Sequence, residues 1–130
     1  MLKIEHLTKV YSNGKKAVDD LSLIVEPGDI YGFIGANGAG KTSTIKAIVG
    51  IHDFDKGEIY ICGHSIKKEP LLCKKKMAFL PDNPDLYKNL TARQFLDFVA
   101  DIYRVSMEKR QAAIEKYSKM FELDTSLDQL

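Results

Sequence analysis

Long apolar runs are absent from this 130-residue chain, and so is any excess of charge of one sign. No stretch approaches the roughly 18 consecutive apolar residues of a membrane span. The opening MLKIEHLTKVYSNGKK carries charges every few residues and lacks the apolar core of a signal peptide. We therefore expect no direct membrane span and a cytoplasmic location. Nineteen basic residues against eighteen acidic ones leave a net charge of +1, so no nucleic-acid partner is expected.

Cysteine is also scarce, and its placement excludes two further classes of protein. Cys62 and Cys73 have no second CxxC pair or clustered histidines beside them, so neither a zinc site nor a disulfide framework is indicated. The composition, 45% apolar and 28% charged, is that of a folded globular protein. A length of 130 residues corresponds to one domain at most.

Apolar patterning predicts strands in the first two thirds of the chain. Alternation over residues 2–11 and 17–26 predicts two half-buried strands joined by the turn SNGKK. The apolar run IYGFIG (30–35) predicts a strand buried on both faces, and so does KMAFLP (76–81). A further strand is predicted for GEIYICG (57–63).

Helical spacing predicts three helices. The first covers residues 41–50, with Gly50 at its C-terminal end. A capping box, Thr91 to Gln94, begins the second, and the third starts from Ser106. The apolar and aromatic stripes of the last two helices are expected to pack in a core.

Residues 35–42, GANGAGKT, match the pattern G-x-x-x-x-G-K-[ST] in full, between an apolar run and a predicted helix. Glycines allow backbone amides to turn toward a phosphate, and the helix adds its positive end. Lys41 is expected to reach the terminal phosphates, and the Thr42 hydroxyl to ligate Mg²⁺. The predicted nucleotide-binding residues of this loop are Gly35, Asn37, Gly38, Ala39, Gly40, Lys41, Thr42 and Ser43.

With its flanks, this loop resembles the start of an ATP-binding-cassette (ABC) transporter ATPase. The similarity begins with LTKVYSNGKKAVDDLSLIVEPGDIYGFIGANGAGKTSTIKAIVGI and continues through GEIYICGHSI and FLPDNPDLYKNLTARQFLDF. It implies ATP and Mg²⁺ as ligands. In that family an aromatic residue after the first strand stacks on adenine, and Tyr11 holds the matching position. From its spacing alone, a tyrosine at a strand end would be a packing residue.

The resemblance also assigns FLPDNPDLY to the loop that links nucleotide to the membrane partner. Asp82 stands where the family usually has glutamine, and a carboxylate there can still contact Mg²⁺. Alternatively, MAFLPD resembles the second metal-binding motif of phosphate-loop enzymes, although Pro81 interrupts it and Asn83 replaces the catalytic glutamate. The first interpretation is preferred. Residues 81–90 are expected to form an exposed loop that contacts membrane-spanning transporter subunits.

The chain shows no LSGGQ-like signature, no apolar strand ending in Asp-Glu and no switch histidine. It therefore resembles the N-terminal portion of such an ATPase. The expected fold is α/β: a partial phosphate-loop NTPase core with an N-terminal antiparallel β subdomain and the start of a helical subdomain. The predicted division is a nucleotide-binding core over 1–90 and the helical subdomain over 91–130.

Three functions follow from these motifs. The first is the ATP-binding portion of an ABC transporter ATPase, which in full form hydrolyses ATP, pairs with a second ATPase subunit and works at the inner face of the membrane. The second is a soluble ABC-type ATPase without a membrane partner. The third is a nucleotide-binding fragment that lacks catalytic activity, because the acidic metal-binding and signature motifs are absent from these 130 residues.

Overall fold

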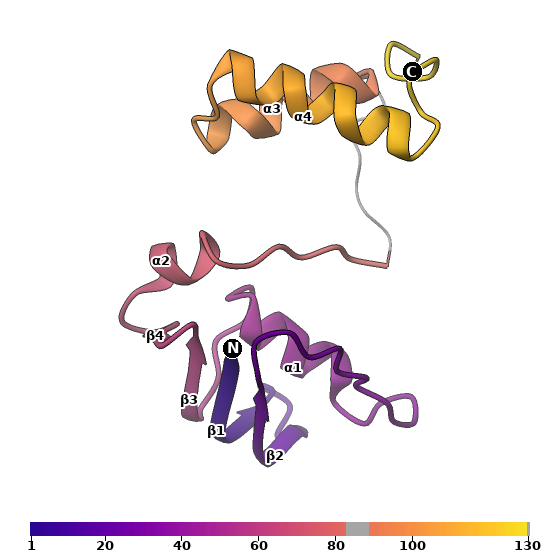
Figure 1. The fold of residues 1–130 in the computed structure, drawn as a ribbon. Helices are drawn as coiled ribbons and strands as arrows, with labels where there is room; N and C mark the ends of the chain where they lie inside the picture. Colours follow the sequence, from indigo (N-terminus) through magenta and orange to yellow (C-terminus); the bar gives the residue numbers. More distant parts are fainter. Residues whose placement is uncertain (83–88, 130) are drawn as a thin grey trace. The chain divides into compact units, whose positions relative to one another are not determined.

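The structure, a computed structural model, describes residues 1–82 and 89–129. These residues form two compact units, Met1–Leu80 and Pro81–Leu130. The first unit contains a β-sheet and two helices, and the second contains a pair of helices (Figure 1). The predicted domain boundary after residue 90 stays a prediction.

The first unit is built on a four-stranded antiparallel sheet with the order β2-β1-β3-β4. Strands β1 (Leu2–Val10) and β2 (Lys16–Val25) form the predicted hairpin. A strand close to the one predicted at 57–63 is present as β3 (Lys56–Ile61), and it pairs with the other edge of β1. The chain then continues into the short β4 (His64–Ser65), which pairs with β3. The register of β1 shifts between Glu5 and Thr8, which is the mark of a bulge.

Helix α1 (Lys41–Ile48) packs against this sheet and closes the core. Its buried face consists of Thr44 and Ala47, whereas Ile45 is exposed. The helix ends as expected, because Gly50 has a left-handed backbone with φ of 70° and donates its amide to the Ala47 carbonyl. The core combines residues of the sheet, α1 and the segment that follows β4: Ile4, Leu7, Val18, Ala47, Ile59, Ile61, Ile66 and Cys73.

Two predicted buried strands, at 30–35 and 76–81, are wrong. Within residues 1–82 and 89–129, no strand pairs with either segment, and both run as coil (Figure 1). Tyr31 and Phe33 line an apolar groove against α1, but Ile30 and Ile34 are 102% and 94% exposed. An extended segment becomes a buried strand only when neighbours satisfy its backbone groups on both edges. Apolar composition alone cannot supply those neighbours.

A short helix that no sequence pattern predicted, α2 (Pro70–Lys74), follows β4. Pro70 lies in its first turn, where a missing amide hydrogen costs nothing. The helix brings Cys73 into the core with no exposed surface, and the thiol donates to the His64 carbonyl at 3.2 Å. Burial raises the pKa of the Cys73 thiol.

The second unit pairs α3 (Ala92–Ile102) with α4 (Met107–Met120). The capping box is confirmed: the Gln94 amide donates to the Thr91 hydroxyl, and the Thr91 amide donates to the Gln94 side chain. Arg110 of α4 joins the two helices, because its guanidinium donates to Asp97 at 3.1 Å and also to Asp101. The hydrogen bonds that Arg110 donates to Asp101 and Asp97 raise the pKa of its guanidinium group, which therefore stays charged.

The expectation that the stripes of these two helices form a core is wrong for this unit. No residue of α3 is buried, and Phe98, Ile102 and Tyr103 are 45%, 61% and 60% exposed. On α4 and just beyond it, Met120 and Phe121 are 61% and 65% exposed. A pair of helices has too much surface for its volume to enclose both apolar stripes.

None of the helices in the described parts of the chain has both the length and the apolar content to cross a membrane.

The described core predicts that two isoleucines of different burial contribute differently to stability. Ile59 has no exposed surface, whereas Ile24 on β2 is 53% exposed. We expect Ile59→Ala to lower the free energy of unfolding by about 2–5 kcal/mol, because it leaves a cavity. Ile24→Ala, which removes the same atoms at the surface, should cost less than about 1 kcal/mol. Urea unfolding followed by circular dichroism measures both, and equal costs would contradict the described core.

Candidate functional site: the phosphate loop

The loop GANGAG leads directly into α1. Its residues 35–39 are exposed, and the helix begins at Lys41 with Gly40 as the capping residue. Gly38 and Gly40 have φ values of 81° and 91°, in the left-handed region that favours glycine. The Ala39 amide donates to the Ala36 carbonyl at 3.2 Å, which closes the turn. The sequence therefore places an exposed glycine turn at the N-terminus of a helix, where unpaired amides and the helix dipole attract an anion.

Gly40 is also the point at which the loop meets the sheet. A Cβ atom at this position would lie 2.1 Å from the carbonyl oxygen of Ala17 on β2. No side chain fits in that space, so the first residue before α1 must be glycine for the loop to lie against β2. No pattern in the sequence indicates Ala17, because its backbone carbonyl, and not its side chain, makes the contact.

Lys41 points back over the loop. Its ammonium donates to the carbonyl oxygens of Gly35 at 2.5 Å and Ala36 at 2.8 Å. The positive charge thus lies beside the turn formed by the glycines, on an exposed part of the unit. A phosphate oxygen is a stronger partner for an ammonium group than a neutral carbonyl is. An anion at this turn would therefore compete favourably with the two carbonyl oxygens for the Lys41 ammonium.

The structure brings Tyr11 to this loop across 32 residues of sequence. The Tyr11 hydroxyl shares a 2.9 Å hydrogen bond with the hydroxyl of Ser43, in the first turn of α1. Tyr11 follows β1 directly, and the Lys9 ammonium lies 5.6 Å from the centre of its ring. An aromatic ring therefore lies beside the N-terminus of α1, where a nucleotide base could stack on it. From the sequence, Tyr11 and Ser43 were assigned to one site only because the chain resembles the ABC transporter ATPases.

The two predicted metal ligands lie in different units. Thr42 is exposed in the first turn of α1, and Asp82 is exposed in the second unit. Within residues 1–82 and 89–129 no group of three histidine, cysteine or acidic side chains could hold a metal ion. Both assignments stay predictions. Most of the predicted partner loop, 81–90, lies outside the described residues.

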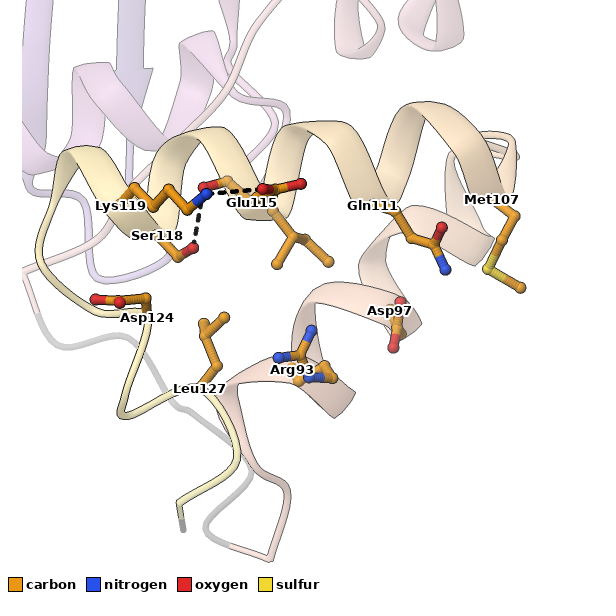
Figure 2. Close-up of a pocket in the computed structure, with 10 residues that line it drawn as sticks. Arg93, Asp97, Met107, Gln111, Glu115, Ser118, Lys119, Asp124 and Leu127 are labelled. Atoms are coloured by element: carbon orange, nitrogen blue, oxygen red, sulfur yellow. Dashed lines mark hydrogen bonds and ion pairs between the residues drawn. The ribbon is translucent and has the colours of Figure 1, made fainter.

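The second unit has a groove of its own, of about 500 Å³, between α3, α4 and the segment after α4 (Figure 2). Most of the charged groups that line it form ion pairs. Lys119 pairs with Glu115 at 2.7 Å and Arg93 with Asp128 at 2.7 Å, and these hydrogen bonds lower the pKa of both carboxyl groups. None of the predicted nucleotide-binding residues lines the groove. The loop at α1, with its glycine turn and lysine, remains the candidate site.

The ABC transporter family model matches residues 18–130, and the chain belongs to that family. Among curated proteins, the uncharacterized ABC transporter ATP-binding protein YhcH of Bacillus subtilis is 38% identical over 116 residues, which are 88% of this chain and 38% of that protein. The SkfA peptide export ATP-binding protein SkfE of the same species is 34% identical over 130 residues, which are 100% of this chain and 53% of SkfE.

Solved structures agree with the family. An ATP-binding subunit of an ABC transporter superposes with a TM-score of 0.88 at 29% identity, over 98% of this chain and 53% of that subunit. The predicted fold class, a partial phosphate-loop NTPase core with an antiparallel β subdomain, is confirmed. This chain spans about half the length of that subunit and of SkfE.

The contact at Gly40 predicts that two neighbouring glycines respond differently to substitution. Both have positive φ, but a Cβ at Gly38 would meet nothing within 4 Å. Gly38→Ala should cost only the left-handed strain of about 1–2 kcal/mol. Gly40→Ala should cost the same strain plus the clash with Ala17, and should unseat the start of α1. Unfolding free energies and amide exchange of α1 measure the difference. Similar losses for both variants would show that the loop does not lie against β2.

Proposed function

We propose that this chain is the ATP-binding portion of an ABC transporter ATPase subunit, with the phosphates of ATP on residues 35–43. The observation that carries the proposal is the exposed glycine turn at the start of α1 with the Lys41 ammonium beside it. Family membership supports ATP as the ligand. The amides of the loop would bind phosphate oxygens, Lys41 would neutralise the terminal phosphates, and Tyr11 would stack on the base.

The residues present fit a magnesium nucleotide. Mg²⁺ keeps several waters and is held largely by the phosphates of the nucleotide, so an exposed hydroxyl in the loop would supply one of its protein ligands. Thr42, next to Lys41, is that hydroxyl. Asp82 would be a second ligand. When bound, the ion would neutralise phosphate charge and hold the terminal phosphates in place.

We further propose that these 130 residues bind ATP without turning it over. Transfer of a phosphoryl group to water needs a residue that orients the water, besides positive charge on the phosphates. Lys41, Thr42 and the loop amides provide charge and one metal ligand. The acidic pair that would complete the metal site does not occur in the sequence. Asp82 lies between Pro81 and Asn83, which make a poor frame for a substitute carboxylate.

Partners and location follow from the family as proposals. The full-length subunit would pair with a second ATPase subunit and couple hydrolysis to transport. Residues 81–90 would contact membrane-spanning subunits at the cytoplasmic face of the membrane. The nucleotide-binding core would then comprise residues 1–90, and residues 91–130 would begin the helical subdomain.

Lys41→Ala should abolish most ATP binding. Lys41 has its ammonium on the loop, whereas Lys46 lies in the last turn of the same helix and is the matched control. A charge-assisted contact contributes about 1.5–3 kcal/mol, so we expect a loss of roughly ten- to a hundredfold for Lys41→Ala and little change for Lys46→Ala. Calorimetric titration with Mg-ATP measures both affinities. Equal affinities for folded wild type and Lys41→Ala would disprove phosphate binding at this loop.

Phosphate release from Mg-ATP should stay at background for the purified chain, even at concentrations that favour dimers. The reason is the missing acidic pair, since positive charge alone does not orient water. A continuous phosphate assay measures the rate. Lys41→Ala is the control for contaminating ATPases: steady release by wild type that this variant abolishes would contradict the proposal.

A further inference from the structure

We propose that His52 is a positioning residue for the nucleotide base: it holds the ring of Tyr11 in place so that the ring can stack on the base. The proposal rests on the proposed function, because it concerns the same ATP site. His52 lies just beyond the end of α1 and has no place in the phosphate loop. Its ring meets the Tyr11 ring in a T-shaped arrangement, with centroids 6.3 Å apart and planes at 88°.

The backbone at Tyr11 is fixed by hydrogen bonds that do not involve the Tyr11 side chain. The Tyr11 amide donates to the Lys15 carbonyl at 2.9 Å, and the Tyr11 carbonyl accepts from Gly14 at 2.8 Å. The preceding residue is fixed as well, since the Val10 amide donates to the Asp55 carboxylate at 2.7 Å. These backbone hydrogen bonds leave the rotation of the Tyr11 side chain to be set by side-chain contacts.

Two contacts limit that rotation. The hydroxyl end is held by Ser43 in the first turn of α1, at 2.9 Å. The ring is flanked by His52, and an edge-to-face aromatic contact has a preferred geometry that a purely apolar neighbour lacks. Tyr11 is therefore held at two points that both depend on the position of α1.

His52 can act in this way because its own position is fixed. The amides of Ile51 and His52 both donate to the Lys46 carbonyl, at 2.9 and 3.1 Å, which ties the segment to α1. Its Nδ1 atom is buried and has no hydrogen-bond partner within residues 1–82 and 89–129. Because no described residue makes a hydrogen bond at Nδ1, packing orients the His52 ring at this side. The contact with Tyr11 is part of that packing.

Positioning matters because a stacking platform contributes most when it is already ordered. A Tyr11 side chain that rotates freely would lose its rotamer freedom on binding the base, which weakens the nucleotide complex. Inorganic tripolyphosphate has the phosphates of ATP and no base, so it tests the phosphate loop alone. A residue that acts through Tyr11 should affect ATP and leave tripolyphosphate unchanged.

The experiment compares the affinities of ATP and tripolyphosphate, both with Mg²⁺, by calorimetric titration of the full chain. We expect His52→Ala to weaken ATP by roughly three- to tenfold and to change tripolyphosphate by less than about twofold. His52→Phe, which keeps an aromatic ring, should retain ATP affinity within about twofold. In a Tyr11→Ala background, His52→Ala should add no further loss. His64→Ala is the matched control, because the His64 ring pairs with Glu69.

Several results would overturn the proposal. Unchanged ATP affinity in His52→Ala would remove His52 from the site, and equal losses for ATP and tripolyphosphate would show a general structural role. A loss that persists in the Tyr11→Ala background would show that His52 does not act through Tyr11. If the wild-type chain binds neither ligand, the proposed function itself fails, and this inference fails with it. The two failures are therefore distinguishable.

Discussion

The phosphate loop can lie against the sheet because residue 40 has no side chain. A Cβ at Gly40 would lie 2.1 Å from the Ala17 carbonyl, closer than any non-bonded contact allows. This close approach seats the start of α1 on β2, and the rest of the first unit depends on that placement. It brings Ala47 into the core beside residues of β1 and β3, and it leaves the glycine turn exposed at the end of the helix.

Helix α1 then organises the whole candidate site. Lys41 and Ser43 lie in its first turn, and His52 is tied to its C-terminal end through the Lys46 carbonyl. Tyr11, which arrives from β1, contacts Ser43 through its hydroxyl and His52 through its ring. A single rigid helix thus connects the group expected to bind phosphate with the groups that hold the expected base platform.

The apolar surfaces of the chain have a different origin. Ile34 and Leu80 are 94% and 84% exposed in the first unit, and Phe121 is 65% exposed in the second. Each belongs to a segment whose sequence is typical of a buried element. Burial of an apolar side chain contributes about 1.5–3 kcal/mol, but only if another element covers it. Where no element of the described residues covers them, apolar side chains of the kind found in buried strands and helices stay exposed.

Local patterns in the sequence determined the elements that depend on short-range interactions. Period-two alternation predicted the hairpin of β1 and β2, the Thr91 and Gln94 side chains predicted the start of α3, and GANGAGKT predicted the turn before α1. Each of these signals acts between residues that are close in the sequence, so the sequence alone is enough to predict the hairpin, the start of α3 and the turn. Only the tertiary structure decided which strands pair, why position 40 must be glycine, and that His52 lies against Tyr11. The strand pairing joins Leu2 to Ile61, 59 positions away, and the ring contact joins Tyr11 to His52, 41 positions away. Contacts through backbone atoms and ring packing over such separations leave no pattern in the order of the residues.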